Sequence, residues 1–135
     1  MSRRKGRILA FQALYSWDVS QTPLEDLLKF SWQNTPVSED SDENIFARII
    51  VTGAIEHVAQ IDELIKNHLS ANWTMERINK VTLAILRVSI YEMEFQKDSQ
   101  KKIVIDEAVN IAREYGLEDS YKFINAVLDK IGKEE

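Results

Sequence analysis

The stretch that decides the fold is "KVTLAILRVSIYEMEF", residues 80–95, which is apolar on nearly every side when it is wound as a helix. A surface helix carries one apolar stripe, whereas a helix that is apolar on two sides must be covered on both. The segment therefore predicts a central helix with other helices packed around it. Its two apolar faces consist of Val81, Ile85, Val88 and Phe95, and of Leu83, Leu86, Ile90 and Met93.

The chain that precedes this segment is also helical in pattern. It holds only four Gly and two Pro in 135 residues, and no alternating strand pattern persists. A first helix is expected over about residues 4–19, and a second from "TPLE", residues 22–25, where Thr22 caps and Glu25 completes a capping box. The buried face expected for this second helix is Leu24, Leu27, Leu28 and Trp32. A polar, acidic loop, "QNTPVSEDSDEN", residues 33–44, leads into a long helix from about residue 42, bent near Gln60.

Four further helix boundaries are indicated by capping residues and glycines. "ANWTMERI", residues 71–78, predicts a start with Thr74 as the cap. Trp73 and Ile78 are placed there as a hydrophobic staple. "IVIDEAVNIAREYG", residues 103–116, predicts a helix that Gly116 ends, and the last helix is expected from about residue 119 to Gly132.

These elements predict an all-α fold of two antiparallel three-helix bundles packed around a shared core, with six to seven helices in total. A chain of 135 residues is one domain by length. We expect residues 1–135 to form that domain, with an N-terminal bundle over residues 1–70 and a C-terminal bundle over residues 71–135.

The composition excludes several classes of function. The chain has no Cys, so disulfides, thiolate catalysis and cysteine zinc sites are excluded, and a reducing compartment fits. No apolar run approaches the ~18 residues of a spanning helix, and we expect a cytoplasmic protein. His57 and His68 stand eleven residues apart, no glycine-rich phosphate loop occurs, and no serine lies in a nucleophile elbow. We therefore expect no enzyme, no metal site and no cofactor.

The positive charge is concentrated at one end of an acidic chain. The net charge is −5, but without Arg3, Arg4, Lys5 and Arg7 the chain carries 13 basic against 22 acidic side chains, a net −9. A local cluster of this kind indicates a local anionic target. Cations at a helix N-terminus oppose the macrodipole, so we expect this segment to be mobile until an anion neutralises it. Gly6 within the cluster either allows close approach to a nucleic-acid backbone or weakens the first turn.

Single-stranded RNA also needs flat groups on which unpaired bases stack. Most aromatic side chains of a helical protein lie in its core, so only some of the chain's rings are available for that purpose. The candidates are Tyr15, Trp17, Tyr115, Tyr121 and Phe123.

Three stretches of the chain resemble the NusB transcription antitermination factors. "RRKGRILAFQALYSW", residues 3–17, resembles the arginine-rich opening and "ALY" helix of that family, and "AILRVSIYEM", residues 84–93, resembles its central buried helix. "IDEAVNIAREYGLEDSYKFINAVLDKI", residues 105–131, resembles its C-terminal signature. The same helical domain also resembles the leading part of some rRNA cytosine methyltransferases, whose catalytic domain has no counterpart in this sequence.

The resemblance implies a fold of two three-helix bundles and a non-catalytic function. It implies binding to boxA, a short single-stranded element of ribosomal RNA transcripts. It also implies a partner, NusE, which is a small-subunit ribosomal protein, and joint action with other Nus factors on RNA polymerase. Two alternatives stay open: a helical protein–protein scaffold, and a detached RNA-binding domain related to the methyltransferases.

Site residues follow from the resemblance position by position. The arginine-rich motif falls on Arg3, Arg4, Lys5 and Arg7, and Tyr15 is expected near RNA or partner. Tyr115, Asp119 and Phe123 are expected to share one surface, if the turn at Gly116 brings Tyr115 beside the last helix. Asp119 either accepts a hydrogen bond from a base or caps that helix.

The partner surface departs from the family pattern. Tyr15, Thr82 and Lys101 are the expected partner contacts, although Thr82 and Lys101 stand where relatives can have acidic and aromatic residues. Arg87, on the buried helix, is expected to form a structural ion pair. Lys5 stands where the family often has arginine, so it contributes charge without a bidentate fork.

Overall fold

The computed structural model describes residues 3–33 and 41–133, and this part of the chain is helical. The helices are α1 (Arg3–Ser20), α2 (Leu24–Leu27), α3 (Asp42–Glu56), α4 (Val58–Asn67), α5 (Lys80–Ile90), α6 (Lys101–Tyr115) and α7 (Ser120–Lys133), with a 3₁₀ turn η1 (Met75–Arg77) and a π-helical segment η2 (Tyr91–Gln96). The all-α prediction is confirmed. Most of the loop predicted over residues 33–44 lies outside the described residues. No helix in the described ranges is long and apolar enough to cross a membrane.

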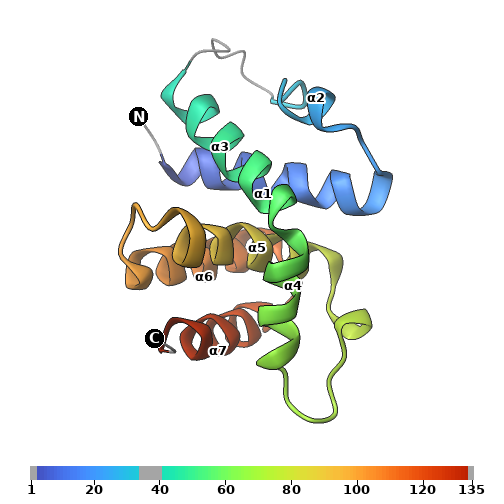
Figure 1. Ribbon diagram of the computed structural model, residues 1–135, viewed down its shortest axis with the longest axis vertical. Helices are drawn as coiled ribbons and strands as arrows, with labels where there is room; N and C mark the ends of the chain where they lie inside the picture. The colour runs from blue at the N-terminus through green and yellow to red at the C-terminus, as the bar shows by residue number, and fades with distance from the viewer. Residues whose placement is uncertain (1–2, 34–40, 134–135) are drawn as a thin grey trace.

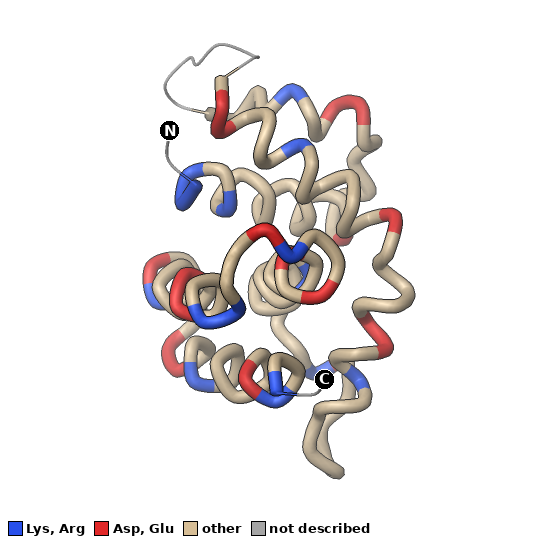
Figure 2. Tube along the Cα trace, turned by 60° about the vertical axis from the view of Figure 1, so that its left-hand side comes forward, with Lys and Arg blue, Asp and Glu red and all other residues tan. Residues whose placement is uncertain are grey.

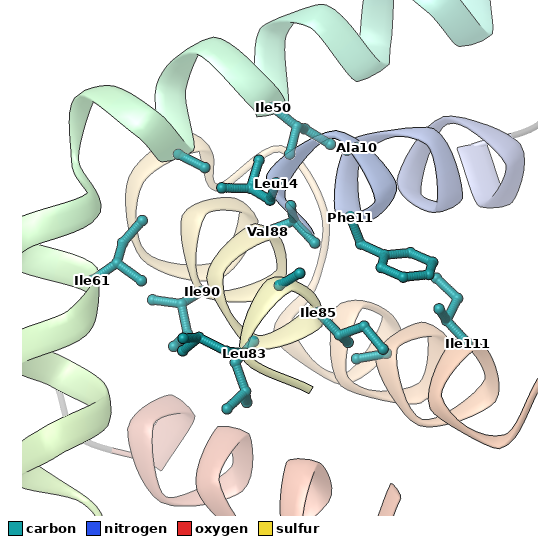
Figure 3. Close-up of a cluster of buried hydrophobic side chains, with 14 of the residues drawn as sticks. Ala10, Phe11, Leu14, Ile50, Ile61, Leu83, Ile85, Val88, Ile90 and Ile111 are labelled. Atoms are coloured by element: carbon teal, nitrogen blue, oxygen red, sulfur yellow. The ribbon is translucent and has the colours of Figure 1, made fainter. Parts of the chain in front are cut away.

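Helix α5 lies at the centre of the molecule, as its sequence predicts. Figure 1 shows α1 and α3 crossing on one side of it, α6 and α7 on the other, and α4 along its flank. Every residue from Thr82 to Ile90 is buried. In Figure 3, Val88 points toward Ala10 and Leu14 of α1, while Ile85 lies on the side of Phe11 and Ile111. Covering on both sides is the reason that this helix needs two apolar faces.

The buried side chains form one continuous hydrophobic cluster. It extends from Leu9 in α1 to Ile131 in α7, and α5 contributes to it on both of its faces. The boundary expected near residue 70 falls in the connection between α4 and α5. The division into two bundles remains a prediction, and the shared core is the feature that positions the surface elements.

The second helix is shorter than the sequence predicts. Thr22 does not cap it: α2 begins after Pro23 and has no side-chain cap. It ends after one turn because Phe30 turns the backbone to a φ of 49° and is itself buried. Trp32, predicted on the buried face, is therefore carried beyond the helix and lies exposed.

Two other boundaries also differ from the predictions. Thr74 precedes only the short turn η1, and α5 starts later, where the Asn79 side chain accepts hydrogen bonds from Val81 N at 2.9 Å and Thr82 N at 3.3 Å. Asparagine is a favoured cap because its side-chain oxygen satisfies these otherwise unpaired donors. Gly132 lies inside α7 rather than ending it. The bend expected near Gln60 occurs three residues earlier, at His57 between α3 and α4.

Candidate nucleic-acid interface

The cationic cluster forms the first turn of α1, which begins at Arg3 and has no acidic residue in that turn. Figure 2 shows Lys and Arg side by side at this end of the helix. Arg3, Arg4 and Lys5 are exposed, whereas Arg7 is only 4% exposed. The expectation of four solvent-facing cations is therefore corrected to three. The helical spacing itself is the reason, because Arg7 lies on the face of α1 that packs on the core.

A buried carboxylate neutralises Arg7. Its Nε donates to Glu92 Oε1 at 2.7 Å and its Nη2 donates to Glu92 Oε2 at 3.0 Å, a bidentate pair. Glu92 is 2% exposed and lies in the π-helical segment that continues α5. Ser99 Oγ lies 3.5 Å from Arg7 Nη2. The guanidinium thus ties the first turn of α1 to the protein interior and is not presented to a ligand.

Arg4 pairs with a carboxylate at the surface. Its Nε donates to Glu107 Oε2 at 2.9 Å and its Nη2 lies 3.4 Å from Glu107 Oε1. This hydrogen bond and the charge of Glu107 raise the pKa of Arg4 above its ordinary value. Arg3 lies over the ring of Phe46, 4.8 Å from its centroid. Carboxylates of the protein itself, Glu107 and Glu92, thus lie beside two of the cations that were predicted to await an anionic ligand.

Gly6 allows a close approach, but to another helix rather than to a ligand. A Cβ atom added to Gly6 would lie 2.6 Å from Phe46 Cδ2 and 3.1 Å from the Glu43 carbonyl oxygen of α3. Any larger side chain overlaps this ring or this backbone. The glycine in the cluster therefore sets how near α1 comes to α3.

Farther along α1, aromatic side chains surround a hollow of about 340 Å³. Tyr15 comes from α1, Tyr115 from the end of α6 and Trp32 from the segment after α2, and all three are exposed. Tyr115 packs edge-on against Phe11 at 5.4 Å between ring centroids. Trp32 Nε1 donates to Gln12 Oε1 at 2.9 Å. These contacts hold three flat groups around one opening, which we call the tyrosine hollow.

A second hollow, of about 290 Å³, lies between the start of α5 and the α6–α7 turn. Asp119 and Phe123 line it, together with Thr82 and the exposed ring of Trp73. The Trp73 and Phe123 ring centroids are 5.9 Å apart. We call this opening the tryptophan hollow. Asp119 and Phe123 thus line one hollow, whereas Tyr115 lines the tyrosine hollow next to it, and a surface shared by all three residues stays a prediction.

The two hollows are neighbours. At the start of α5, Val81 lines the tyrosine hollow and the next residue, Thr82, lines the tryptophan hollow. At the other side, Tyr115 lines the tyrosine hollow and Leu117, two residues later, lines the tryptophan hollow. The two aromatic openings therefore lie next to each other.

Asp119 is an exposed residue in a conformation that few side chains adopt. Its φ is 70°, in the left-handed region, directly before α7. Its Oδ1 lies 3.5 Å from Lys122 Nζ, and both side chains are two-thirds exposed. The carboxylate is consequently accessible to a ligand at the rim of the tryptophan hollow.

The expected partner residues do not gather on one surface. Thr82 is 3% exposed and borders the tryptophan hollow next to the tyrosine hollow of Tyr15. Lys101 lies at the start of α6, where its Nζ donates to the Gly132 carbonyl at 3.2 Å. It lines a separate hollow between α6 and α7. Lys101 is thus set apart from the other two.

The ion pair expected for Arg87 is confirmed. Its Nε and Nη2 donate to the two carboxylate oxygens of Asp62 at 2.9 and 2.8 Å, and Asp18 Oδ2 lies 3.3 Å from its Nη1. Arg87 is buried, and its pairing joins α1, α4 and α5.

Sequence reasoning missed Trp32 and Trp73 as exposed aromatic candidates. The sequence predicts packed roles for both, Trp32 on the buried face of a helix and Trp73 in a hydrophobic staple. A signal for Trp32 exists in the sequence, because the polar segment "QNT" follows it directly and a helix that ends early leaves it at the surface. Trp73 gave no comparable signal.

The comparison with known proteins points to one family. The model of the NusB family matches residues 4–133. Among curated relatives, the transcription antitermination protein NusB of Treponema denticola is 51% identical over 97% of this chain and 96% of its own length. The NusB proteins of two Treponema pallidum strains are 43% identical over 98% of this chain and 94% of their own length.

Solved structures agree with the sequence relatives. T. maritima NusB superposes with a TM-score of 0.85 at 34% identity, covering 100% of this chain and 93% of its own. A chain from a crystal structure of the antitermination factors NusB and NusE in complex with dsRNA superposes with a TM-score of 0.85 at 29% identity, covering 98% of this chain and 97% of its own. Because the family model spans residues 4–133 and these relatives match over 94–96% of their own length, this protein belongs to the NusB family.

Proposed function

We propose that this protein is a transcription antitermination factor that binds the single-stranded boxA element of ribosomal RNA transcripts together with NusE. In this proposal it acts in the cytoplasm, with other Nus factors, to help RNA polymerase read through terminators, and it catalyses no reaction. The curated relatives bear the antitermination name, and one solved relative was crystallised with NusE and dsRNA. These relatives favour antitermination over the methyltransferase-like alternative.

One observation carries the RNA part of the proposal: exposed cations and exposed rings lie along the same seam of the molecule. Contacts between Arg4 and Glu107, and between Phe11 and Tyr115, join α1 to α6 at two points. Arg4 and Tyr15 are eleven residues apart on α1, or about 17 Å at 1.5 Å per residue. A strand of RNA along this seam has cations for its phosphates at one end and aromatic faces for its bases at the other.

The proposed division of labour follows from the chemistry of each group. Arg3, Arg4 and Lys5 hold phosphates, which carry no sequence information. Tyr15 and Tyr115 offer faces to unpaired bases, while Phe123 and the acceptor Asp119 provide a second place for a base beside them. We leave Arg7 out of the contact set, since Glu92 holds its guanidinium in the interior.

Single-stranded RNA fits these hollows better than a duplex does. Bases of a duplex are stacked on one another and do not present their faces to side chains, whereas unpaired bases do. Four rings line the tyrosine hollow, together with Gln12, Ser16 and Val81. An unpaired base can offer its face to such rings.

The test is fluorescence anisotropy with labelled RNA over a salt series, with and without NusE. The probes are a single-stranded boxA oligonucleotide, a scrambled strand of equal composition, and the boxA duplex. We expect the boxA strand to bind most tightly and NusE to increase its advantage over the scrambled strand. Equal binding of boxA and scrambled strands in the presence of NusE overturns the proposal. NusE binding without RNA selectivity supports the scaffold alternative instead.

A further inference from the structure

The surface carboxylate that holds Arg4 belongs to a helix far away in the sequence. Glu107 stands on α6, 103 residues from Arg4, and its two oxygens face Nε and Nη2 of the guanidinium. We propose that Glu107 is an internal competitor of RNA, occupying the place on Arg4 that an RNA phosphate takes in the complex. This inference rests on the proposed function and adds a residue that sets how strongly the cationic turn binds.

The geometry of the contact supports an exchange of ligands. A guanidinium offers two parallel N–H groups, and carboxylates and phosphates both accept them through two oxygens. The Arg4–Glu107 contact uses this arrangement, with distances of 2.9 and 3.4 Å. A phosphate that binds Arg4 in the same way must first displace Glu107.

Exposure makes this exchange possible. The side chain of Arg4 is 50% exposed and that of Glu107 is 22% exposed, so solvent and ions reach the pair. Exposed ion pairs contribute little free energy because water screens them and both side chains lose freedom. In the neighbouring Arg7–Glu92 pair, the side chain of Arg7 is only 5% exposed and that of Glu92 only 2%. Solvent and ions therefore do not reach this pair to exchange its partners. Of the two carboxylates that pair with arginines at this end of α1, Glu92 is fixed in the interior and Glu107 is exchangeable at the surface.

Competition by Glu107 would increase the selectivity of the protein between RNA sequences. Phosphate contacts favour every RNA equally, so an unopposed cationic cluster binds all transcripts. A carboxylate that must be displaced lowers this sequence-independent contribution, and Glu114 adds negative charge near Arg4. Stable binding then depends more on the base contacts in the aromatic hollows.

Asp106 provides a matched control for a charge change at Glu107. It precedes Glu107 on the same helix and is exposed, but it lines the hollow between α6 and α7. Adjacent helical residues point about 100° apart. Glu107→Gln and Asp106→Asn therefore remove the same charge from nearby positions, and only the first frees Arg4.

The experiment measures anisotropy of a single-stranded boxA oligonucleotide and a scrambled strand with the wild-type chain, Glu107→Gln, Asp106→Asn, and each change combined with Arg4→Ala. We expect Glu107→Gln to bind both strands about two- to fivefold more tightly than Asp106→Asn, the range of an exposed ion pair. In the Arg4→Ala background the two variants should bind alike. Thermal melts of the same samples show whether each variant is folded.

Three outcomes overturn the inference. Equal gains for the two single variants mean that only long-range charge matters, and a gain that persists in the Arg4→Ala background means that Glu107 acts through another group. Weaker binding by a folded Glu107→Gln variant means that Glu107 positions Arg4 for RNA. A fourth outcome, failure of the wild-type chain to bind either strand at any salt concentration both with and without NusE, overturns the proposed function together with the inference.

Discussion

The two ends of α1 use their conspicuous side chains in opposite ways. In the first turn, the basic residues face groups of the protein itself: Arg7 is held by Glu92, Arg4 by Glu107, and Arg3 lies over Phe46. Farther along, Tyr15 meets Tyr115 and Trp32 around a hollow and stays exposed. Charges that look available in the sequence are thus partly used inside the fold. Rings that usually belong in a core are exposed here.

The largest expected effect tests whether Arg7 is structural. Arg7→Ala leaves Glu92 buried without its partner, and loss of one member of a buried pair costs about 3–5 kcal/mol of unfolding free energy. Denaturant unfolding followed by circular dichroism measures it. Arg4→Ala is the matched control, because its partner Glu107 is reached by solvent, and its unfolding midpoint should stay close to that of the wild-type chain. Similar midpoints for the two variants would contradict the contrast drawn between the two arginines.

The next effect concerns the aromatic end of α1. Tyr15→Ala and Tyr115→Ala should each weaken boxA binding by about 1–3 kcal/mol, the value of one base stacked on one ring. Tyr15→Phe and Tyr115→Phe keep the ring face and serve as controls, with affinities near wild type. Anisotropy on the boxA strand gives the comparison. If the phenylalanine variants lose as much as the alanine variants, the hydroxyl groups and not the ring faces contact the RNA.

Gly6 tests how tightly the cationic end packs on α3. Gly6→Ala places a methyl group against the Phe46 ring, and overpacking of this kind costs about 1–3 kcal/mol, partly offset by the better helix propensity of alanine. Gly132→Ala is the control. It also lies within a helix, but its nearest neighbour is the flexible Met93 Cε at 3.2 Å. Thermal unfolding should separate the two, and equal melting temperatures would mean that α1 and α3 can move apart without cost.

The smallest expected effect is a change in how steeply RNA affinity falls with salt concentration. Three exposed cations in place of four predict that log K for single-stranded RNA falls with log salt by roughly −2 instead of roughly −3, at about 0.7 per phosphate contact. A salt series with the wild-type chain and with an Arg3→Ala and Arg4→Ala double variant measures it. The slope of the variant should be smaller in magnitude by about 1.4, because it loses two contacts of about 0.7 each. A wild-type slope of −3 would mean that another cation joins the RNA contact.

Much of the fold follows from the local pattern of the sequence. Residues 80–95 predict a central helix because they are apolar on two faces, and other helices cover both faces of α5 in the structure. The helix start at Asp42 is also where the sequence places it, and Ser41 Oγ accepts a hydrogen bond from Asn44 N at 3.2 Å. The predictions at Thr22 and Thr74 are wrong, because a capping residue marks a possible start but not the length of the helix that follows. There, burial of Phe30 and capping by Asn79 decided the outcome.

The sequence by itself determined the family, the all-helical fold and the residue types proposed to face an RNA: arginines and lysine at one end, tyrosines and phenylalanine elsewhere. Only the tertiary structure decided which of them are available. Arg7 and Glu92 are 85 residues apart, and Arg4 and Glu107 are 103 residues apart. The pairing of Tyr115 with Tyr15, and not with Phe123, likewise depends on how α6 lies against α1. Periodicity fixes the faces of a single helix, whereas these contacts form only when separate helices pack.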